Sequence, residues 1–229
     1  MEEQLQTNKG VVYVTSGSTY TRMAIASAET VKRHNPKIAI HLFTDQENIS
    51  SPFINSVGLI TAPHRRSKVD YLHHSPFEQT LYLDADTFVL ASLEEMFDVL
   101  TRFDIAMTHC HKRNIENTTQ NWNVKIPYAF PQLNSGVVLY RKNDIVTKLF
   151  SEWQAAYHSS GFKKDQVTLR ELVWLSNARL HILPPEYNIR FRKYLEIWTE
   201  EEVDAKILHD EEFTIFFKQS LRHDVTKDV

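Results

Sequence analysis

The stretch LYLDADTFVL, residues 81–90, interrupts an apolar run with two carboxylates, Asp84 and Asp86. The residues before them predict a buried β-strand, and residues i and i+2 of a strand point to the same side. We therefore expect the two carboxylates to converge where the strand ends. Convergent carboxylates repel each other unless a cation compensates them, and hard oxygen ligands suit magnesium or manganese. The spacing predicts a metal site. The alternative is that the acids cap the next segment or pair with surface Lys and Arg.

The elements around this stretch alternate between strand-like and helix-like patterns. Apolar, β-branched runs predict further strands at 11–15, 38–45, 57–63, 104–110, 136–140, 179–183 and 206–209. Helical spacing predicts helices after the turn SGST, after Ser92 with Glu95 as a capping box, after Asn143, and at 165–175. The alternation favours an α/β fold with a mainly parallel sheet flanked by helices, in which ligands bind beyond the carboxyl ends of the strands. Because no linker-like stretch is present, we expect a single domain over residues 1–229.

Composition excludes several classes of protein. The 229 residues are 42% hydrophobic and 24% charged, which is typical of a folded globular chain. A net charge of −3 gives no electrostatic signature of nucleic-acid binding, and a lone cysteine, Cys110, excludes an internal disulfide framework. No apolar run approaches the ~20 residues that span a bilayer, and the polar start MEEQLQTNKG is unlike a secretory signal. We therefore expect a cytoplasmic protein without a transmembrane segment.

The glycines are isolated from one another along the chain, at Gly10, Gly17, Gly58, Gly136 and Gly161. Dinucleotide fingerprints and phosphate-binding loops need closely spaced glycines, because backbone N–H groups must approach the phosphates. Neither pattern is present. If the protein binds a nucleotide, another group must neutralise the phosphate charge, and a metal at the two aspartates would do so.

Several segments, in order, resemble the GT-A glycosyltransferases, especially the glycogenin-like and lipopolysaccharide-galactosyltransferase group (glycosyltransferase family 8). The resemblance covers roughly residues 10–210 and rests on VVYVTSGSTYTRMAIASAETVKRHNP, IAIHLFTD, SKVDYLHHSPFEQTLYLDADTFVL, LNSGVVLYRKND, KDQVTL, LPPEYNIR and AKILHD. It implies a GT-A, Rossmann-like domain. It also implies transfer of a sugar from a nucleotide-diphosphate donor, usually a UDP-sugar, to a glycan or other hydroxyl acceptor, with Mn²⁺ or Mg²⁺ as cofactor.

The resemblance also implies roles for individual residues. Metal ligands would be Asp86, His209 and Asp84, with Asp84 also meeting the ribose. Lys68 would hold the diphosphate or the sugar. The remaining donor contacts would come from Thr15 and Ser16 at the uridine, and from Asn134 and Ser135 at the sugar. Asp165 and Gln166 would lie near the anomeric carbon as the catalytic residues.

Each of these residues has a plainer interpretation. His209 could be a surface histidine paired with Asp210, and Lys68 could belong to a solvated basic face. Asp165 could cap the helix at 165–175, and Asn134-Ser135 could only shape a turn. The clusters His73-His74 and His109/Cys110/His111 could instead bind metal, but they lack the i, i+4 or C-x-x-C spacing of a zinc site.

The reaction class has alternatives as well. In retaining members of the group, the acceptor attacks from the face of the departing diphosphate, whose oxygen takes the acceptor proton. Asp165 and Gln166 would then stabilise an oxocarbenium-like state. An inverting enzyme needs a base opposite the leaving group, and Asp165 is the candidate. A sugar-phosphate nucleotidyltransferase and a non-catalytic sugar-nucleotide-binding module are the remaining alternatives.

The chain also departs from the group. The segment after His209, DEEFTIFFKQSLRHDV, lacks the usual glycine–lysine–proline–tryptophan continuation, whose lysine meets the diphosphate. Lys218 or Arg222 could take that lysine's place. We expect the acceptor pocket to draw on residues 111–133, where Trp122, Tyr128 and Phe130 could stack on sugar rings or anchor the loop.

Overall fold

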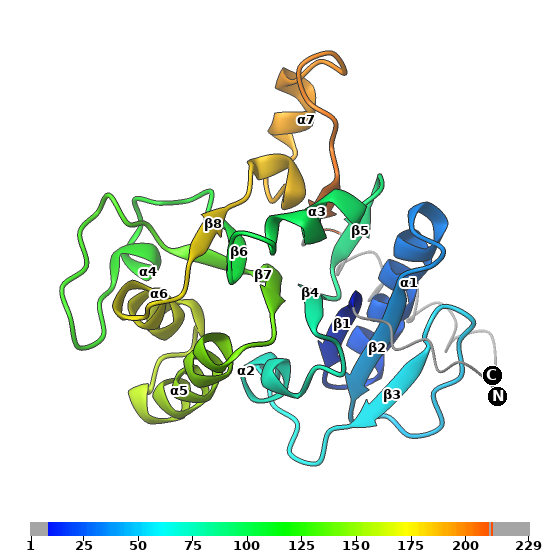
Figure 1. Ribbon diagram of the computed structural model, residues 1–229, viewed down its shortest axis with the longest axis horizontal. Coiled ribbons are helices and arrows are strands. Elements are labelled where there is room, and N and C mark those ends of the chain that lie inside the picture. The colour runs from blue at the N-terminus through cyan, green and yellow to red at the C-terminus, as the bar shows by residue number, and fades with distance from the viewer. Residues whose placement is uncertain (1–8, 211, 213–229) are drawn as a thin grey trace, which may run out of the picture.

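The strand that ends at Leu83 lies in the middle of a seven-stranded sheet (Figure 1). The computed structural model describes residues 9–210 and residue 212. The strand order is β3 (Ser56–Leu59), β2 (Ala39–Thr44), β1 (Lys9–Thr15), β4 (Gln79–Leu83), β7 (Leu133–Arg141), β6 (Ile105–His109) and β8 (Leu180–Ile182). Strand β7 runs antiparallel to both of its neighbours, and all other neighbours are parallel. The prediction of a mainly parallel sheet is confirmed.

The reversed direction of β7 determines what lies at the carboxyl end of β4. Leu83, the last residue of β4, pairs with Val137. The residues just before Val137, from Asn134 to Gly136, therefore continue past the end of β4. The Asp84 N–H donates to the Gly136 carbonyl at 2.7 Å, which fixes the chain of Asp84 against this part of β7.

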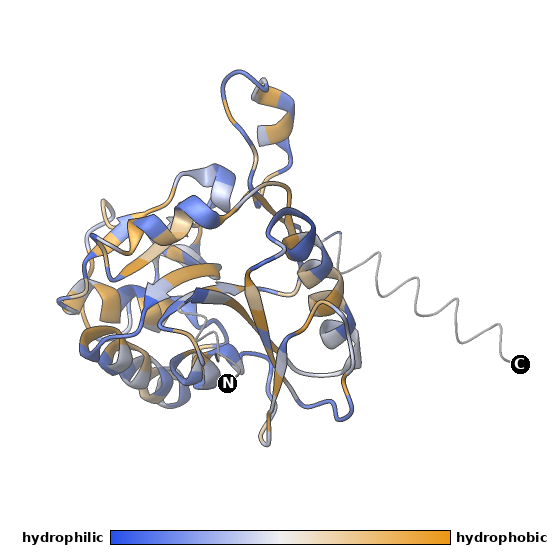
Figure 2. Cartoon of the chain, turned by 45° about the vertical axis from the view of Figure 1, so that its right-hand side comes forward, coloured by the Kyte–Doolittle hydropathy of each residue, from blue (hydrophilic) through white to orange (hydrophobic). Residues whose placement is uncertain are grey.

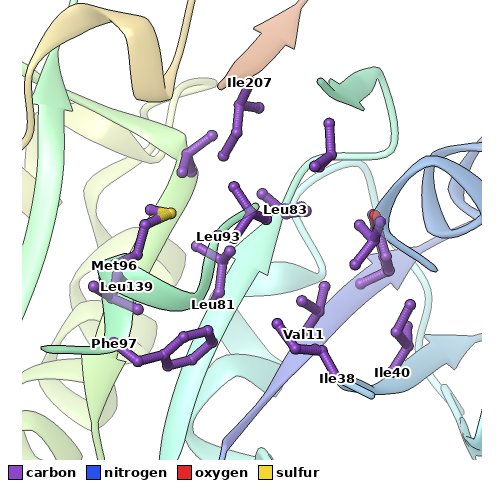
Figure 3. Close-up of a cluster of buried hydrophobic side chains, with 14 of the residues drawn as sticks. Val11, Ile38, Ile40, Leu81, Leu83, Leu93, Met96, Phe97, Leu139 and Ile207 are labelled. Carbon is purple, nitrogen blue, oxygen red and sulfur yellow. The ribbon is translucent and has the colours of Figure 1, made fainter. Parts of the chain in front are cut away.

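Alternating side chains of the strands form two cores, one on each face of the sheet. On one face, Leu81 and Leu83 pack with helix α1 (Ser18–His34) and helix α3 (Glu94–Val99) (Figure 3). On the other face, Tyr82 packs with α2 (Lys68–Tyr71), α5 (Asp144–Ser160) and α6 (Gln166–Leu175). Figure 2 shows the apolar colour along the central strands and mixed colours along the helices, as expected for strands that are covered on both faces.

The remaining elements are short. A second sheet pairs β5 (Thr87–Val89) with β9 (Ile207–His209) in antiparallel fashion, with Thr87 opposite His209. Short helical turns complete the chain at η1 (Leu72–His74), α4 (Glu116–Thr119), η2 (Pro185–Tyr187) and α7 (Lys193–Ile197). Pairing of β5 with β9 brings the last described strand next to the two aspartates.

Two predicted helix starts have different outcomes. The Asn143 side chain accepts the N–H of Val146, which confirms the predicted cap of α5. The predicted capping box at Ser92 is wrong, because the residue before α3 is Leu93, which is fully buried and makes no side-chain cap.

Lys218 and Arg222 lie outside the described residues. None of the described helices has the length and apolar character that a membrane crossing requires.

Candidate metal and donor site

The three predicted metal ligands lie together at the carboxyl end of β4. Asp84 and Asp86 occupy the turn between β4 and β5, and His209 ends β9. His209 Nε2 is 3.2 Å from Asp86 Oδ1 and 3.7 Å from Asp84 Oδ2. Each residue offers one ligand atom within 4.8 Å of the other two, which is close enough for a single cation to contact all three.

A hydrogen-bonded chain behind His209 sets which ring nitrogen faces the aspartates. His209 Nδ1 is 2.8 Å from Asn188 Oδ1, and Asn188 Nδ2 donates to Thr108 Oγ1 at 3.1 Å. Because an amide oxygen can only accept, Nδ1 carries a proton and Nε2 is the ring nitrogen that faces the two carboxylates. A cation bound at Nε2 would take the place of any proton there. Two carboxylates and an imidazole nitrogen arranged in this way fit a divalent cation.

His209 is 3% exposed, so its interpretation as a surface histidine is wrong. Asp210, the proposed surface partner, instead forms an ion pair with Arg192. The role of Asn188 was not predicted from the sequence. It lies within the segment LPPEYNIR, but no local pattern links an asparagine to a histidine 21 residues later.

Gly136 permits the close approach of Asp84 and His209. A Cβ atom at this position would lie 2.1 Å from His209 Cε1 and 2.8 Å from Asp84 Oδ2. Its own N–H donates to Asn134 Oδ1 at 2.8 Å. A glycine is therefore needed at this position, because any side chain would occupy the space of Asp84 and His209. The neighbouring residues of β7 are buried.

Lys68 is buried, with 4% of its surface exposed, so the interpretation as a solvated basic face is wrong. Its Nζ lies 3.0 Å from Asp84 Oδ1 and donates to the Ser135 carbonyl at 2.8 Å. Burial raises the pKa of the Asp84 carboxyl, but the charges of Lys68 and His209 and a hydrogen bond from Tyr82 outweigh burial. The pKa lies below its usual range as a result. Asp84 is thus held as the carboxylate that a metal ligand must be.

Asp165 lies beneath the site and not at its surface. It is 1% exposed, and it is not among the residues that line the cavity described below. Its Oδ2 accepts the Ser135 hydroxyl at 2.6 Å, and its Oδ1 lies 3.2 Å from Arg66 Nε. It occupies the position before α6 without capping a helix N–H, so the capping interpretation is also wrong. The contacts show a carboxylate that holds Arg66, Lys68 and Ser135 in place.

The cavity beside these residues has a volume of about 590 Å³. It collects the other predicted site residues from three parts of the chain, namely Thr15 and Ser16, Asn134 and Ser135, and Gln166. The Gln166 side chain donates to the Leu133 carbonyl at 3.1 Å, which fixes its amide at the wall. The cavity is also rich in cations that were not assigned from the sequence: Arg65, Arg66, Lys164 and Arg190.

The aromatic residues of the 111–133 segment do not line this cavity, so their role in an acceptor pocket stays a prediction. Buried Glu171 on α6 accepts the N–H groups of Trp122 and Asn123, and Trp122 lines a separate groove between α5 and α6. Phe130 packs against Trp174 with 5.1 Å between ring centroids. Helix α6 therefore anchors the segment through Glu171 and Trp174. Among the described residues, neither of the proposed zinc clusters forms a group of three ligands.

Comparisons with known proteins agree with this geometry. Residues 79–227 match the family described as nucleotide-diphospho-sugar transferase. The structure of galactosyltransferase LgtC with donor and acceptor sugar analogues superposes with a TM-score of 0.64 at 16% identity, covering 88% of this chain and 87% of that chain. Mouse xyloside xylosyltransferase 1 gives 0.57 at 12% identity, with 89% and 97% covered. Glycosyltransferase GlyE of Streptococcus pneumoniae TIGR4 gives 0.59 at 16%, with 87% and 53% covered. A search of curated proteins found no match. The superpositions show the GT-A fold.

Proposed function

Since the chain belongs to the nucleotide-diphospho-sugar transferase family, we propose that it is a metal-dependent glycosyltransferase that uses a UDP-sugar. The observation that carries this proposal is the convergence of His209 Nε2, Asp84 and Asp86 at the wall of a cation-lined cavity. In this proposal residues 1–229 form a single transferase domain, and the acceptor is a glycan or another hydroxyl compound.

Asp84, Asp86 and His209 would hold Mn²⁺ or Mg²⁺. When bound, the metal neutralises charge that accumulates on the departing nucleotide diphosphate. Two carboxylates favour these hard cations, and the imidazole favours manganese of the two. The buried ammonium of Lys68 supports the same role, because it is fixed beside Asp84 and borders the cavity where the diphosphate would lie.

The remaining lining residues suggest how the donor lies. Thr15 ends β1 and Ser16 follows it, and both would contact the nucleoside. Asn134 and Ser135, at the start of β7, would contact the transferred sugar. Lys68 lies between the proposed metal ligands and the sugar-contacting residues, since its Nζ reaches both Asp84 and the Ser135 carbonyl.

We propose that the sugar is transferred with retention of configuration. The burial of Asp165 supports retention, because a carboxylate without access to the cavity cannot take a proton from the acceptor. The neutral amide of Gln166 borders the cavity instead and would stabilise the developing positive charge of the sugar. The acceptor proton would leave on the diphosphate oxygen. Asp165 would act as a positioning residue for Lys68 and Arg66.

The test is to incubate the protein with UDP-, GDP- and dTDP-sugars and Mn²⁺ and to identify the released product. Release of a nucleoside diphosphate, lost in the presence of a chelator, is the expected result. Release of pyrophosphate would instead establish a nucleotidyltransferase, and tight binding without turnover would establish a binding module. In the His209→Ala variant, we expect activity to require a higher Mn²⁺ concentration.

A further inference from the structure

The segment between Ile189 and Ile207 projects from the body of the molecule and carries α7 (Figure 1). We call residues 190–206 the arm. Its two ends meet at its base, because the Ile189 N–H donates to the Ile207 carbonyl at 2.8 Å and the Ile189 carbonyl accepts the His209 N–H at 2.9 Å. Ile189 is fully buried. The base of the arm is therefore fixed beside the proposed metal ligand His209.

Aromatic rings follow one another along the arm. The ring of His111, on the loop after β6, stacks on Phe191 with 5.9 Å between centroids and 15° between planes. Phe191 meets Tyr194 edge-on at 5.6 Å, and Tyr194 stacks on Trp198 at 4.8 Å. We call these four residues the aromatic ladder. Two of them, His111 and Phe191, are exposed and the other two are half-buried, so each keeps surface in contact with solvent.

The inner end of the aromatic ladder lies where the sugar would be transferred. Phe191 directly follows Arg190, a lining residue of the cavity. His111 directly follows Cys110, whose Sγ is 3.4 Å from Gln166 Nε2. Two separate segments therefore bring the first two rings next to the cavity and its proposed catalytic amide. The other two rings belong to α7 and the residue that ends it, so they continue the ladder along the projecting arm.

A row of exposed rings suits a chain of sugars. One face of a sugar ring presents C–H groups, which bury against an aromatic ring while the hydroxyl groups stay in contact with water or polar side chains. A lipid chain or a partner helix would instead need a continuous apolar surface. The arm does not offer one, because the exposed charged residues Arg192, Lys193 and Glu196 separate its apolar side chains.

We propose that the aromatic ladder binds the acceptor as an extended glycan, with the accepting hydroxyl near Gln166 and the following sugars on the rings of the arm. This inference rests on the proposed glycosyltransferase function and names an acceptor class for it. Contacts to the sugars that do not react would help to place the accepting hydroxyl. Longer glycans should therefore be better acceptors than short ones.

The first experiment measures the effect of glycan length. An array of glycans of one to six sugars is probed with the protein, and the series that binds is titrated by calorimetry. We expect affinity to rise about 2- to 10-fold for each ring of the ladder that a further sugar engages. If no glycan binds more tightly than its monosaccharide, the inference is wrong. Mn²⁺-dependent release of UDP from the donor with water as acceptor would then still leave the proposed function standing, whereas absence of UDP release and of UDP binding would remove both.

Variants then assign the length dependence to the rings. Trp198→Ala should weaken the longest glycan of the series about 2- to 10-fold and the disaccharide less, and Trp198→Phe should keep most of the preference. Ile197→Ala is the matched control, because Ile197 is 67% exposed on the same arm and is not one of the four ladder residues. Circular dichroism verifies folding of each variant. Equal losses in Trp198→Ala and Ile197→Ala would show a general apolar surface for a protein or a lipid, and would overturn the inference.

Discussion

His209 takes its orientation from Asn188, which lies 21 residues earlier in the chain. The amide oxygen of Asn188 holds the proton of the imidazole on Nδ1 and leaves Nε2 to the aspartates. Asn188 is itself 5% exposed and held by Thr108, so its orientation is fixed by β6 and not by solvent. The proposed metal site therefore depends on a residue that is not one of its three proposed ligands.

We expect Asn188→Ala to weaken Mn²⁺ binding about 10- to 100-fold, the range found when a partner of a metal-ligating histidine is removed. Asn188→Asp should retain affinity, because a carboxylate also accepts the Nδ1 proton. The measurement is Mn²⁺ titration by calorimetry, with circular dichroism to verify folding. Equal Mn²⁺ affinity in the alanine variant and the unmodified protein would show that Asn188 has no positioning role.

The placement of a site residue could be predicted only where the neighbouring sequence has a recognisable pattern. The i, i+2 spacing predicts the convergence of Asp84 and Asp86 from strand geometry alone. His209 and Lys68 were assigned only through the family resemblance, because nothing local distinguishes either from a surface residue. The burial of Asp165 could not be predicted, since an acid before a helix is typical both of a cap and of a catalytic group.

At the scale of elements, strand β7 brings Asn134, Ser135 and Gly136 to the ligand edge because it runs against its neighbours. The apolar run that predicts β7 is the same in either direction, so its antiparallel pairing could not be inferred from hydrophobicity. For the same reason, the pairing of β5 with β9 could not be inferred from the sequence. The positions of the strands along the chain were predicted well, but the pairing of the strands that creates the site was not predicted.

Gly136→Ala should disrupt the metal site, because its methyl group would overlap His209 Cε1 and crowd Asp84 Oδ2. We expect Mn²⁺ affinity to fall at least about 10-fold, as when ligand positioning is lost. Gly161→Ala is the control. Gly161 ends α5 at φ 72° with no atom near its missing Cβ, so this change should cost about 1 kcal/mol of stability and leave metal affinity intact. Equal Mn²⁺ affinities in the two variants would contradict the steric account.

At the scale of the whole molecule, Asp104 joins three strands. It precedes β6 and is 1% exposed. Its carboxylate accepts hydrogen bonds from Arg179, before β8, and from Arg141, at the end of β7. Together with the Asn143 side chain, these contacts hold the half of the sheet that carries α5 and α6. Hydrogen bonds from Arg179, then from Arg141, hold the pKa of the Asp104 carboxyl well below its usual range.

A carboxyl with a lowered folded-state pKa stabilises the fold above its unfolded pKa, about 3.9, and loses that contribution as the pH falls toward the folded value. We expect Asp104→Ala to reduce the free energy of unfolding at pH 7 by about 1–3 kcal/mol. The difference from the unmodified protein should shrink as the pH falls below about 4. Urea denaturation between pH 3 and 7 measures both effects. Asp98→Ala, at an exposed carboxylate, is the control, and a constant difference across this range would contradict the account.

In the proposed function, Asp84, Asp86 and His209 bind a divalent cation that in turn holds the nucleotide diphosphate. Calorimetric titration of UDP into the unmodified protein and into Asp86→Ala, each with and without Mn²⁺, tests it most directly. We expect Mn²⁺-dependent UDP binding in the unmodified protein and its loss in the variant. Circular dichroism and thermal unfolding should show an intact fold. Mn²⁺-dependent binding of UDP that persists unchanged in Asp86→Ala would contradict the claim.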